Sequence, residues 1–449
     1  MNPPNLPPPF PQSPPPMVPL PPVPPRKGMG AGWIVLIIVG AVVAVCAVLA
    51  ALALPAYQRI QRMAEEMKQK ESQAVQAPVP LTEAQKTALV QFGNDLADAL
   101  SEKNGARVLA MQDAEGFCAR VFEKIPSGIP NRADMRRGFM NGIQKRDGGW
   151  LWSAMSGDVH FLRTRERLGF PAVLLRIKTP EGAVSYVDIL VRPEGGGFRI
   201  VDMFNYIFAT TASEESRNVL AAMLSKSGGS GLSALLGTPH LDEKTAGFFV
   251  RINDATRTGN MAEVLRICDS LPPELKTQRI FFIVRLQALM ALSSTAKLDQ
   301  QYKEALRAAP DILGKDSTTD LLMVDLLFME NDFKGAEECL KRLDKIIGGD
   351  PYVKFLRAAA RLQAKDYAGA LEMANEAGKE DPEMADVVDL RLAVYLAQKD
   401  FKAVVNELRE FKRNFGQVLD RKALTGEPQY AEFLTSPEFA AWEKEAAQP

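Results

Sequence analysis

Histidine and cysteine are scarce in this chain, and neither sign of charge is in excess. The two histidines are His160 and His240, so we expect no histidine-based metal site. The cysteines lie far apart in the sequence, at Cys46, Cys118, Cys268 and Cys339. They form no CxxC pair and no disulfide framework. Lys and Arg number 54 against 55 for Asp and Glu, and without a basic surplus we do not expect nucleic-acid binding.

Catalytic motifs are missing as well. The sequence has no glycine-rich phosphate loop, no Ser-His-Asp set and no dinucleotide fingerprint. We therefore expect no cofactor and no metal, and we interpret the chain as a binding or scaffolding protein rather than an enzyme.

One segment lacks charge altogether. Residues 28–58 contain no acidic or basic side chain, and the 22 residues from Trp33 to Leu54 are almost wholly apolar. About 20 such residues cross roughly 30 Å of hydrocarbon, so the composition predicts a single transmembrane helix over 31–57 and a place in the cell membrane. A cleaved signal peptide is the alternative, although the apolar run is long for one and a leader precedes it.

The end of this segment carries a family resemblance. Leu49-Ala-Ala-Leu-Ala-Leu-Pro-Ala-Tyr-Gln58 resembles the N-terminal helix of type IV pilins and pseudopilins, and Lys27-Gly28 resembles their prepilin-peptidase boundary. Trp33 stands where the family has a glutamate. The resemblance indicates a bacterial origin. The side of the membrane stays open, because the basic residues after the span and the pilin resemblance favour opposite sides.

The flanks and linkers divide the rest of the chain. Fourteen of the first 25 residues are proline, which predicts a disordered, polyproline-like tail over 1–30. Pro16-Met-Val-Pro19 leaves open a role as ligand for an SH3- or WW-like groove. Residues 58–80 predict a juxtamembrane helix and linker. Residues 225–239, rich in glycine and serine, predict a flexible linker between two folded domains.

Residues 81–224 change from a helical to an alternating pattern. Thr82 is placed to cap a first helix, and residues 114–122 predict another. The alternation that follows predicts four antiparallel strands: Val159–Arg165, Ala172–Thr179, Ser185–Arg192 and Phe198–Phe204. Helices followed by an antiparallel sheet predict an α+β domain. Its order and size are similar to those of the NTF2-like cone.

Two aspartates in this domain are the candidate catalytic residues. If the last turn centres on Gly195, Asp188 and Asp202 lie directly opposite on a face shared with Val173 and Leu175. Carboxylates held together on an apolar surface repel, which raises one pKa and permits general acid or base catalysis. The NTF2-like resemblance implies an isomerase or dehydratase, so a membrane-tethered enzyme is the alternative function. A register slip of one residue separates the pair.

A turn recurs in the C-terminal part. Asp332, Asp366 and Asp400 are spaced by 34 residues twice over. Each is followed by an aromatic residue: Phe333, Tyr367 and Phe401. With a helical pattern over 240–445, this period resembles that of tetratricopeptide repeats (TPRs). The resemblance implies an all-α solenoid of stacked helix hairpins with a concave inner surface.

The resemblance also implies which residues define the repeats. They are the turn aromatics, the small residues at helix crossings and the proline that closes a unit: Phe333, Ala336, Ala358, Tyr367, Ala370, Ala377, Pro382 and Phe401. Small side chains are needed at the crossings because the helices of a hairpin approach closely.

The repeats suggest how a partner is bound. TPR grooves bind peptides or helices, and some hold a C-terminal carboxylate with basic residues on the inner helices. Arg357, Arg361 and Arg391 lie on predicted first helices and are the candidate partner-binding residues. We therefore predict a membrane-anchored adaptor or scaffold that binds a protein partner through the groove. Solvated arginines and a purely structural array are the alternatives, and the oligomeric state stays open.

Overall fold

The structure is a computed structural model that describes most of the chain after residue 79. The described residues are 80–125, 129, 131–145, 148–152, 157–178, 184–225, 247–248, 251–252, 254–256, 258–292, 296–314 and 319–446. The described residues divide into two compact units, one that ends at Leu326 and one that begins at Leu327. Four predicted segments lie outside the described residues: 1–30, 31–57, 58–79 and 226–239.

The membrane-spanning part of the predicted fold class is corrected. Within the described ranges, no helix is both long and apolar enough to cross a bilayer. The longest, α2 (Glu83–Ser101) and α13 (Ala296–Leu313), carry charged residues along their length. The predicted single-pass architecture and the predicted localisation at the cell membrane are therefore corrected as well. The apolar segment over 31–57 that suggested them lies outside the described residues.

The first unit begins with a group of helices. Besides α2 they are α3 (Gly105–Ala110), α4 (Ala114–Phe122), α5 (Arg132–Gln144), α6 (Gly149–Trp152) and α7 (Ala212–Ser225), which follows the sheet. The predicted cap of α2 is confirmed. The Thr82 hydroxyl accepts a hydrogen bond from the Gln85 N–H, and the Gln85 side chain accepts one from the Thr82 N–H at 2.9 Å. This reciprocal pair fixes the start of the helix.

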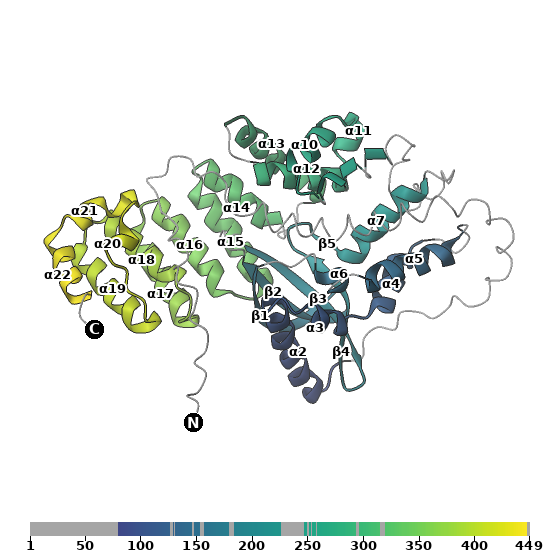
Figure 1. Ribbon diagram of the computed structural model, residues 1–449, viewed down its shortest axis with the longest axis horizontal. Coiled ribbons are helices and arrows are strands. Elements are labelled where there is room, and N and C mark those ends of the chain that lie inside the picture. Colours follow the sequence, from purple (N-terminus) through teal and green to yellow (C-terminus); the bar gives the residue numbers. More distant parts are fainter. Residues whose placement is uncertain are drawn as a thin grey trace, which may run out of the picture. The chain divides into compact units, whose positions relative to one another are not determined.

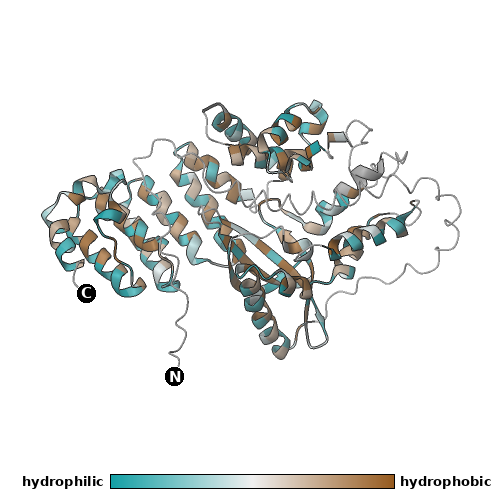
Figure 2. Cartoon of the chain, viewed as in Figure 1, coloured by the Kyte–Doolittle hydropathy of each residue, from teal (hydrophilic) through white to brown (hydrophobic). Residues whose placement is uncertain are grey.

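An antiparallel sheet forms the centre of this domain (Figure 1). Its strands are β1 (Asp158–Arg167), β2 (Phe170–Lys178), β3 (Val184–Glu194), β4 (Gly197–Asn205) and β5 (Thr210–Thr211). They pair in sequence order, each with the next. The four predicted strands correspond to β1–β4, and the short β5 was not predicted. Figure 2 shows that the strands are largely apolar, interrupted by polar residues.

Helix α2 covers one face of the sheet closely. A Cβ atom on Gly93 would lie 2.5 Å from the ring of Phe161 on β1, so the helix can approach the strand only because residue 93 is glycine. Leu89 and Leu96 on the same side of α2 are buried. Helices α4 and α7 pack against β4. The sheet is thus a buried layer, and its polar side chains need partners inside the fold.

Further helices complete the first unit. They are α10 (Met261–Asp269), α11 (Pro273–Lys276), α12 (Arg279–Leu292) and α13, and α14 (Asp320–Met329) contains the boundary between the units. Helix α12 packs against both α10 and α13. The α10 turn, with Gly259 at a φ of 70° and Asn260 as N-cap, has the same design as the turns of the second unit.

The second unit is a row of helices (Figure 1). They are α15 (Phe333–Ile347), α16 (Pro351–Gln363), α17 (Tyr367–Glu380), α18 (Asp386–Ala397) and α19 (Phe401–Phe415), followed by α20 (Arg421–Leu424), η3 (Pro428–Tyr430), α21 (Ala431–Leu434) and α22 (Pro437–Ala446). Each of α15 to α18 packs against the next. An apolar cluster including Phe433, Phe439 and Trp442 joins the terminal helices to α18 and α19. This cluster closes the end of the row.

The turns spaced by 34 residues share one geometry. The residue before each aspartate has a positive φ: Asn331 (59°), Lys365 (62°) and Lys399 (57°). The N–H of Asp366 bonds to the carbonyl of Arg361 at 2.9 Å, which closes α16, and its carboxylate accepts from the Gly369 N–H at 3.0 Å, which caps α17. Asp332 and Asp400 make the equivalent bonds. One aspartate therefore ends the first helix and starts the second.

We call α16 and α18 the first helices and α15, α17 and α19 the second helices. The first helices pack directly on one another, whereas no comparable packing joins successive second helices in this fully described stretch. Neighbours on the inner side of a curved row lie closer together than those on the outer side. The first helices therefore form the inner side of the row.

Candidate functional site

The predicted pairing of Asp188 with Asp202 is wrong. Asp188 lies opposite Phe204, and Asp202 lies opposite Leu190. Two features shift the register: a two-residue turn with both glycines at positive φ, and a bulge after Leu190. Turns of this kind match the twist of the strands, so they are preferred to a turn centred on one residue. The aspartate face is also not the one that carries Val173, because Asp188 pairs with Leu174 on β2.

Asp188 is fully buried and has its own basic partner. Arg165 Nε donates to its Oδ1 at 2.6 Å, and the Tyr206 hydroxyl donates to its Oδ2 at 3.0 Å. Burial raises the pKa of this carboxyl, and the charges of Arg165 and Arg167 act against that rise. The side chain therefore orients an arginine within the sheet.

The carboxylate of Asp202 has hydrogen-bond partners that differ from those of Asp188. Its Oδ2 accepts from Arg120 Nε on α4 at 2.7 Å and from the Ser213 hydroxyl on α7 at 2.5 Å. Its Oδ1 accepts from the Ser213 N–H at 3.0 Å. The bonds attach α4 and α7 to β4. Because each aspartate is neutralised by a different arginine, the two do not form the coupled pair that the enzymatic alternative requires.

The predicted repeat residues take three kinds of position. Ala336, Ala358, Ala370 and Ala377 are fully buried. The turn aromatics Phe333, Tyr367 and Phe401 are half-buried, and Pro382 is exposed. Small residues thus lie where α15, α16 and α17 pack, and the aromatics cover the turns from outside.

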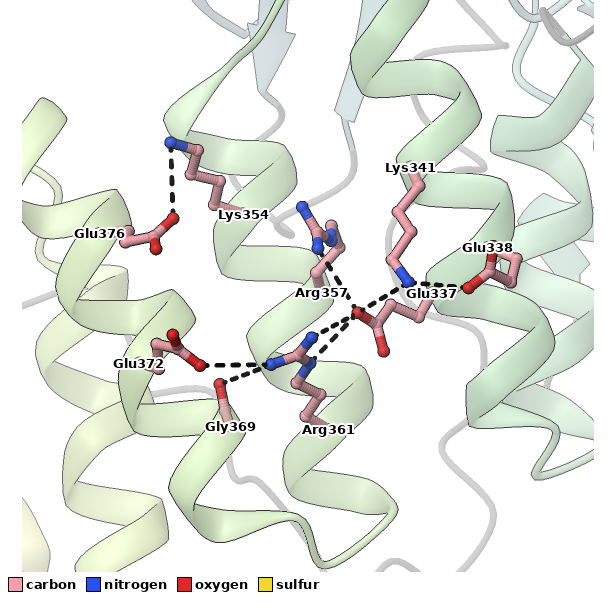
Figure 3. A network of polar contacts seen from close by, with 9 residues as sticks. All are labelled: Glu337, Glu338, Lys341, Lys354, Arg357, Arg361, Gly369, Glu372 and Glu376. Atoms are coloured by element: carbon pink, nitrogen blue, oxygen red, sulfur yellow. Dashed lines mark hydrogen bonds and ion pairs between the residues drawn. The ribbon is translucent and has the colours of Figure 1, made fainter.

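The three candidate partner-binding arginines point towards the second helices. Arg391 on α18 donates from Nε to Glu407 Oε1 on α19 at 2.9 Å. Arg357 and Arg361 on α16 both donate to Glu337 of α15 (Figure 3). Their side chains are only 16–22 % exposed. Carboxylates within the row hold all three, and their expected place on the inner surface stays a prediction. Their role in partner binding stays a prediction.

Glu337 is the centre of this network. Its Oε1 accepts from Arg361 Nη2 at 2.9 Å and Nε at 3.2 Å, and from Arg357 Nη2 at 3.5 Å, while Lys341 Nζ lies 3.5 Å away. Burial acts to raise the pKa of Glu337, but the hydrogen bond from Arg361 and the surrounding positive charges outweigh it, so the pKa is lowered. The carboxylate is ionised at neutral pH and holds more than one cation.

Neither glutamate was predicted from the sequence as a partner of these arginines. Glu337 follows the small residue Ala336, and Glu407 precedes Leu408, so each acid lies beside the buried stripe of a second helix. An acidic residue in such a position signals a buried basic partner. The spacing from Glu337 to Arg361 has no local meaning, because only the packing of α15 on α16 brings them together.

Another set of side chains lies on the other side of the first helices. In an α-helix, residues two positions before and after a given residue lie about 160° away from it around the axis. Phe355 and Ala359 flank Arg357 in this way on α16, and Asp389 and Ala393 flank Arg391 on α18. All four are half-buried. We call these four residues the inner face.

Comparison of the chain with protein-family models, curated proteins and solved structures gave no match. The TPR, NTF2-like and pilin resemblances therefore stay predictions from the sequence.

Proposed function

We propose that the helical row of the second unit is a protein-interaction module that binds a segment of a partner along its inner face. The observation that carries this proposal is the direction of the arginines. They are bonded to glutamates of the second helices, and the opposite side of α16 and α18 is left with aromatic, small and acidic side chains.

The composition of the inner face supports a particular class of partner. Ala359 and Ala393 are small and half-buried, and Phe355 offers an apolar contact. An apolar segment fits this surface better than the C-terminal carboxylate that the arginines had suggested.

Site-specific photo-crosslinking tests the proposal. The photoreactive residue p-benzoylphenylalanine replaces Ala359 or Ala393 in the full chain, and Ala368, an exposed residue of α17, serves as the matched control. The expected result is that both inner positions crosslink to the same protein and that position 368 does not. Crosslinking to that protein from position 368 alone would refute the assignment to the inner face.

A substitution then measures the contribution of the face. Ala393→Arg places a bulky, positively charged side chain on the inner face, whereas Ala368→Arg adds the same side chain outside it. We expect Ala393→Arg to weaken binding of the crosslinked protein at least about tenfold, or ~1.4 kcal/mol, and Ala368→Arg to leave it unchanged. Equal effects of the two variants contradict the proposal.

A further inference from the structure

The connection between α15 and α16 differs from the other turns of the row. It contains Gly348 and Gly349, with φ values of 81° and 98°, and both N–H groups bond to the carbonyl of Asp344 at 2.9 Å. Glycine adopts such φ values freely, so the direction of the chain changes here at low cost. Two aspartates fix the ends of this connection: the Asp344 carboxylate accepts from the Asp350 N–H at 3.1 Å, and the Asp350 carboxylate accepts from the Tyr352 N–H at 3.0 Å and caps α16.

The ion pairs across the glycine connection converge on one group. All those that the basic residues of α16 make with α15 end on the Oε1 atom of Glu337. Of the two arginines that donate to Glu337, Arg357 has the longer hydrogen bond. Its only acceptor is at 3.5 Å, and its Nε is buried without an acceptor among the described residues. If Glu337 lost its charge, Arg357 and Arg361 would lose the one carboxylate of α15 that lies within 4 Å of them.

The other side of α16 is held at several points. Lys354 pairs with Glu376 at 3.8 Å and also with Glu380 (Figure 3 shows the first of these). Arg361 donates to the carbonyl of Gly369 at 3.4 Å and lies 3.8 Å from Glu372. Loss of any one of these contacts leaves the others in place. Polar side-chain contacts thus hold α16 to α17 at more points than they hold α16 to α15.

We propose that the Gly348-Gly349 connection is a hinge of the helical row and that Glu337 is its latch. While the carboxylate is ionised and bonded, α15 is held against α16. When it is neutralised, the helices on the two sides of the hinge move relative to each other. Such movement changes the curvature of the inner face, and this consequence for partner binding rests on the proposed function.

The test measures the hinge directly, without a partner. Spin labels are placed at Lys334→Cys and Ala364→Cys, exposed sites at the ends of α15 and α16 that lie furthest from the hinge. Electron–electron double resonance on the full chain, with Cys46 replaced by serine, gives the distribution of distances between the labels. The expected result is one narrow population in the otherwise native chain and an additional, longer-distance population in Glu337→Gln.

A neighbouring acid provides the matched control. Glu338→Gln removes the same charge one residue away, where the side chain is 53 % exposed and pairs with Lys341. It is expected to keep the narrow distribution. A narrow distribution in Glu337→Gln, or the same broadening in Glu338→Gln, overturns the proposal.

A second variant decides the matter if Glu337→Gln fails to fold. Arg357→Met with Arg361→Met removes the latch from the α16 side and fills the space with apolar atoms, and Glu337 keeps Lys341 as a partner. The longer-distance population is expected here as well, and its absence from the folded variant refutes the latch. Because no partner is present, this outcome is independent of whether the inner face binds one.

Discussion

Lys365 is a residue at which glycine, normally harmful to helical proteins, should stabilise this one. It follows α16 with a φ of 62°, a conformation that glycine adopts freely and lysine does not. The left-handed conformation costs an ordinary residue about 1–2 kcal/mol, and Gly loses about 0.5–1 kcal/mol more than other residues on ordering. The balance predicts that Lys365→Gly raises the free energy of unfolding of the row by about 0.5–1 kcal/mol.

The same substitution in the middle of a helix supplies the control. Glu372 lies within α17 with a side chain that is 67 % exposed, so Glu372→Gly is expected to cost about 1 kcal/mol. Native-state hydrogen exchange of the α16 and α17 amides reports both effects in the full chain. Because asparagine tolerates positive φ better than lysine, Asn331→Gly should stabilise less than Lys365→Gly.

The ranking of these variants is the critical result. Lys365→Gly and Glu372→Gly could both lower the protection of the α16 and α17 amides from hydrogen exchange. In that case the positive φ of Lys365 does not destabilise the fold. The conclusion that one turn geometry builds the row would then fail at this position.

Three further predictions concern buried ionisable groups. Glu407→Gln removes the carboxylate partner of Arg391, whose side chain is 17 % exposed, and should destabilise the row by about 1–3 kcal/mol in urea unfolding, whereas Glu410→Gln, at a site 51 % exposed, should change it by less than about 0.5 kcal/mol. Burial raises the pKa of Asp325 from 3.8 to about 6, against the effect of a tyrosine hydrogen bond, so the folded chain binds the proton more tightly than the unfolded chain. Stability from this group should fall as pH rises from 3.8 to about 6, and an Asp325→Asn variant that keeps the same slope over this window would contradict the assignment. Burial raises the pKa of the Cys118 thiol to about 11, so it should resist iodoacetamide at neutral pH until the chain unfolds, and rapid alkylation of the folded protein, detected by mass spectrometry, would show that it is accessible.

Local features of the fold were predictable wherever neighbouring residues decide them. Thr82 caps α2 because a hydroxyl and a glutamine three residues later can bond each other's N–H groups. The 34-residue spacing of Asp332, Asp366 and Asp400 predicted three turns that proved to have one geometry. The strand positions followed from alternation, which depends only on the pleat of the backbone.

The sites depended on contacts that have no local signal. The register of β3 on β4 shifted by two residues relative to the prediction, because of a turn and a bulge that alternation does not reveal, and this separated Asp188 from Asp202. The arginines of the first helices were found from the sequence, but their direction was not.

By itself, the sequence determined which residues cap, turn and alternate, because those choices are made between neighbours in the chain. Only the tertiary structure decided which charged side chains pair with each other. Arg361 meets Glu337 across two packed helices, and such pairings are set by how close two surfaces come. That packing places the arginines of the predicted groove in ion pairs between helices, with Glu337 on one side of the row and Glu407 further along it.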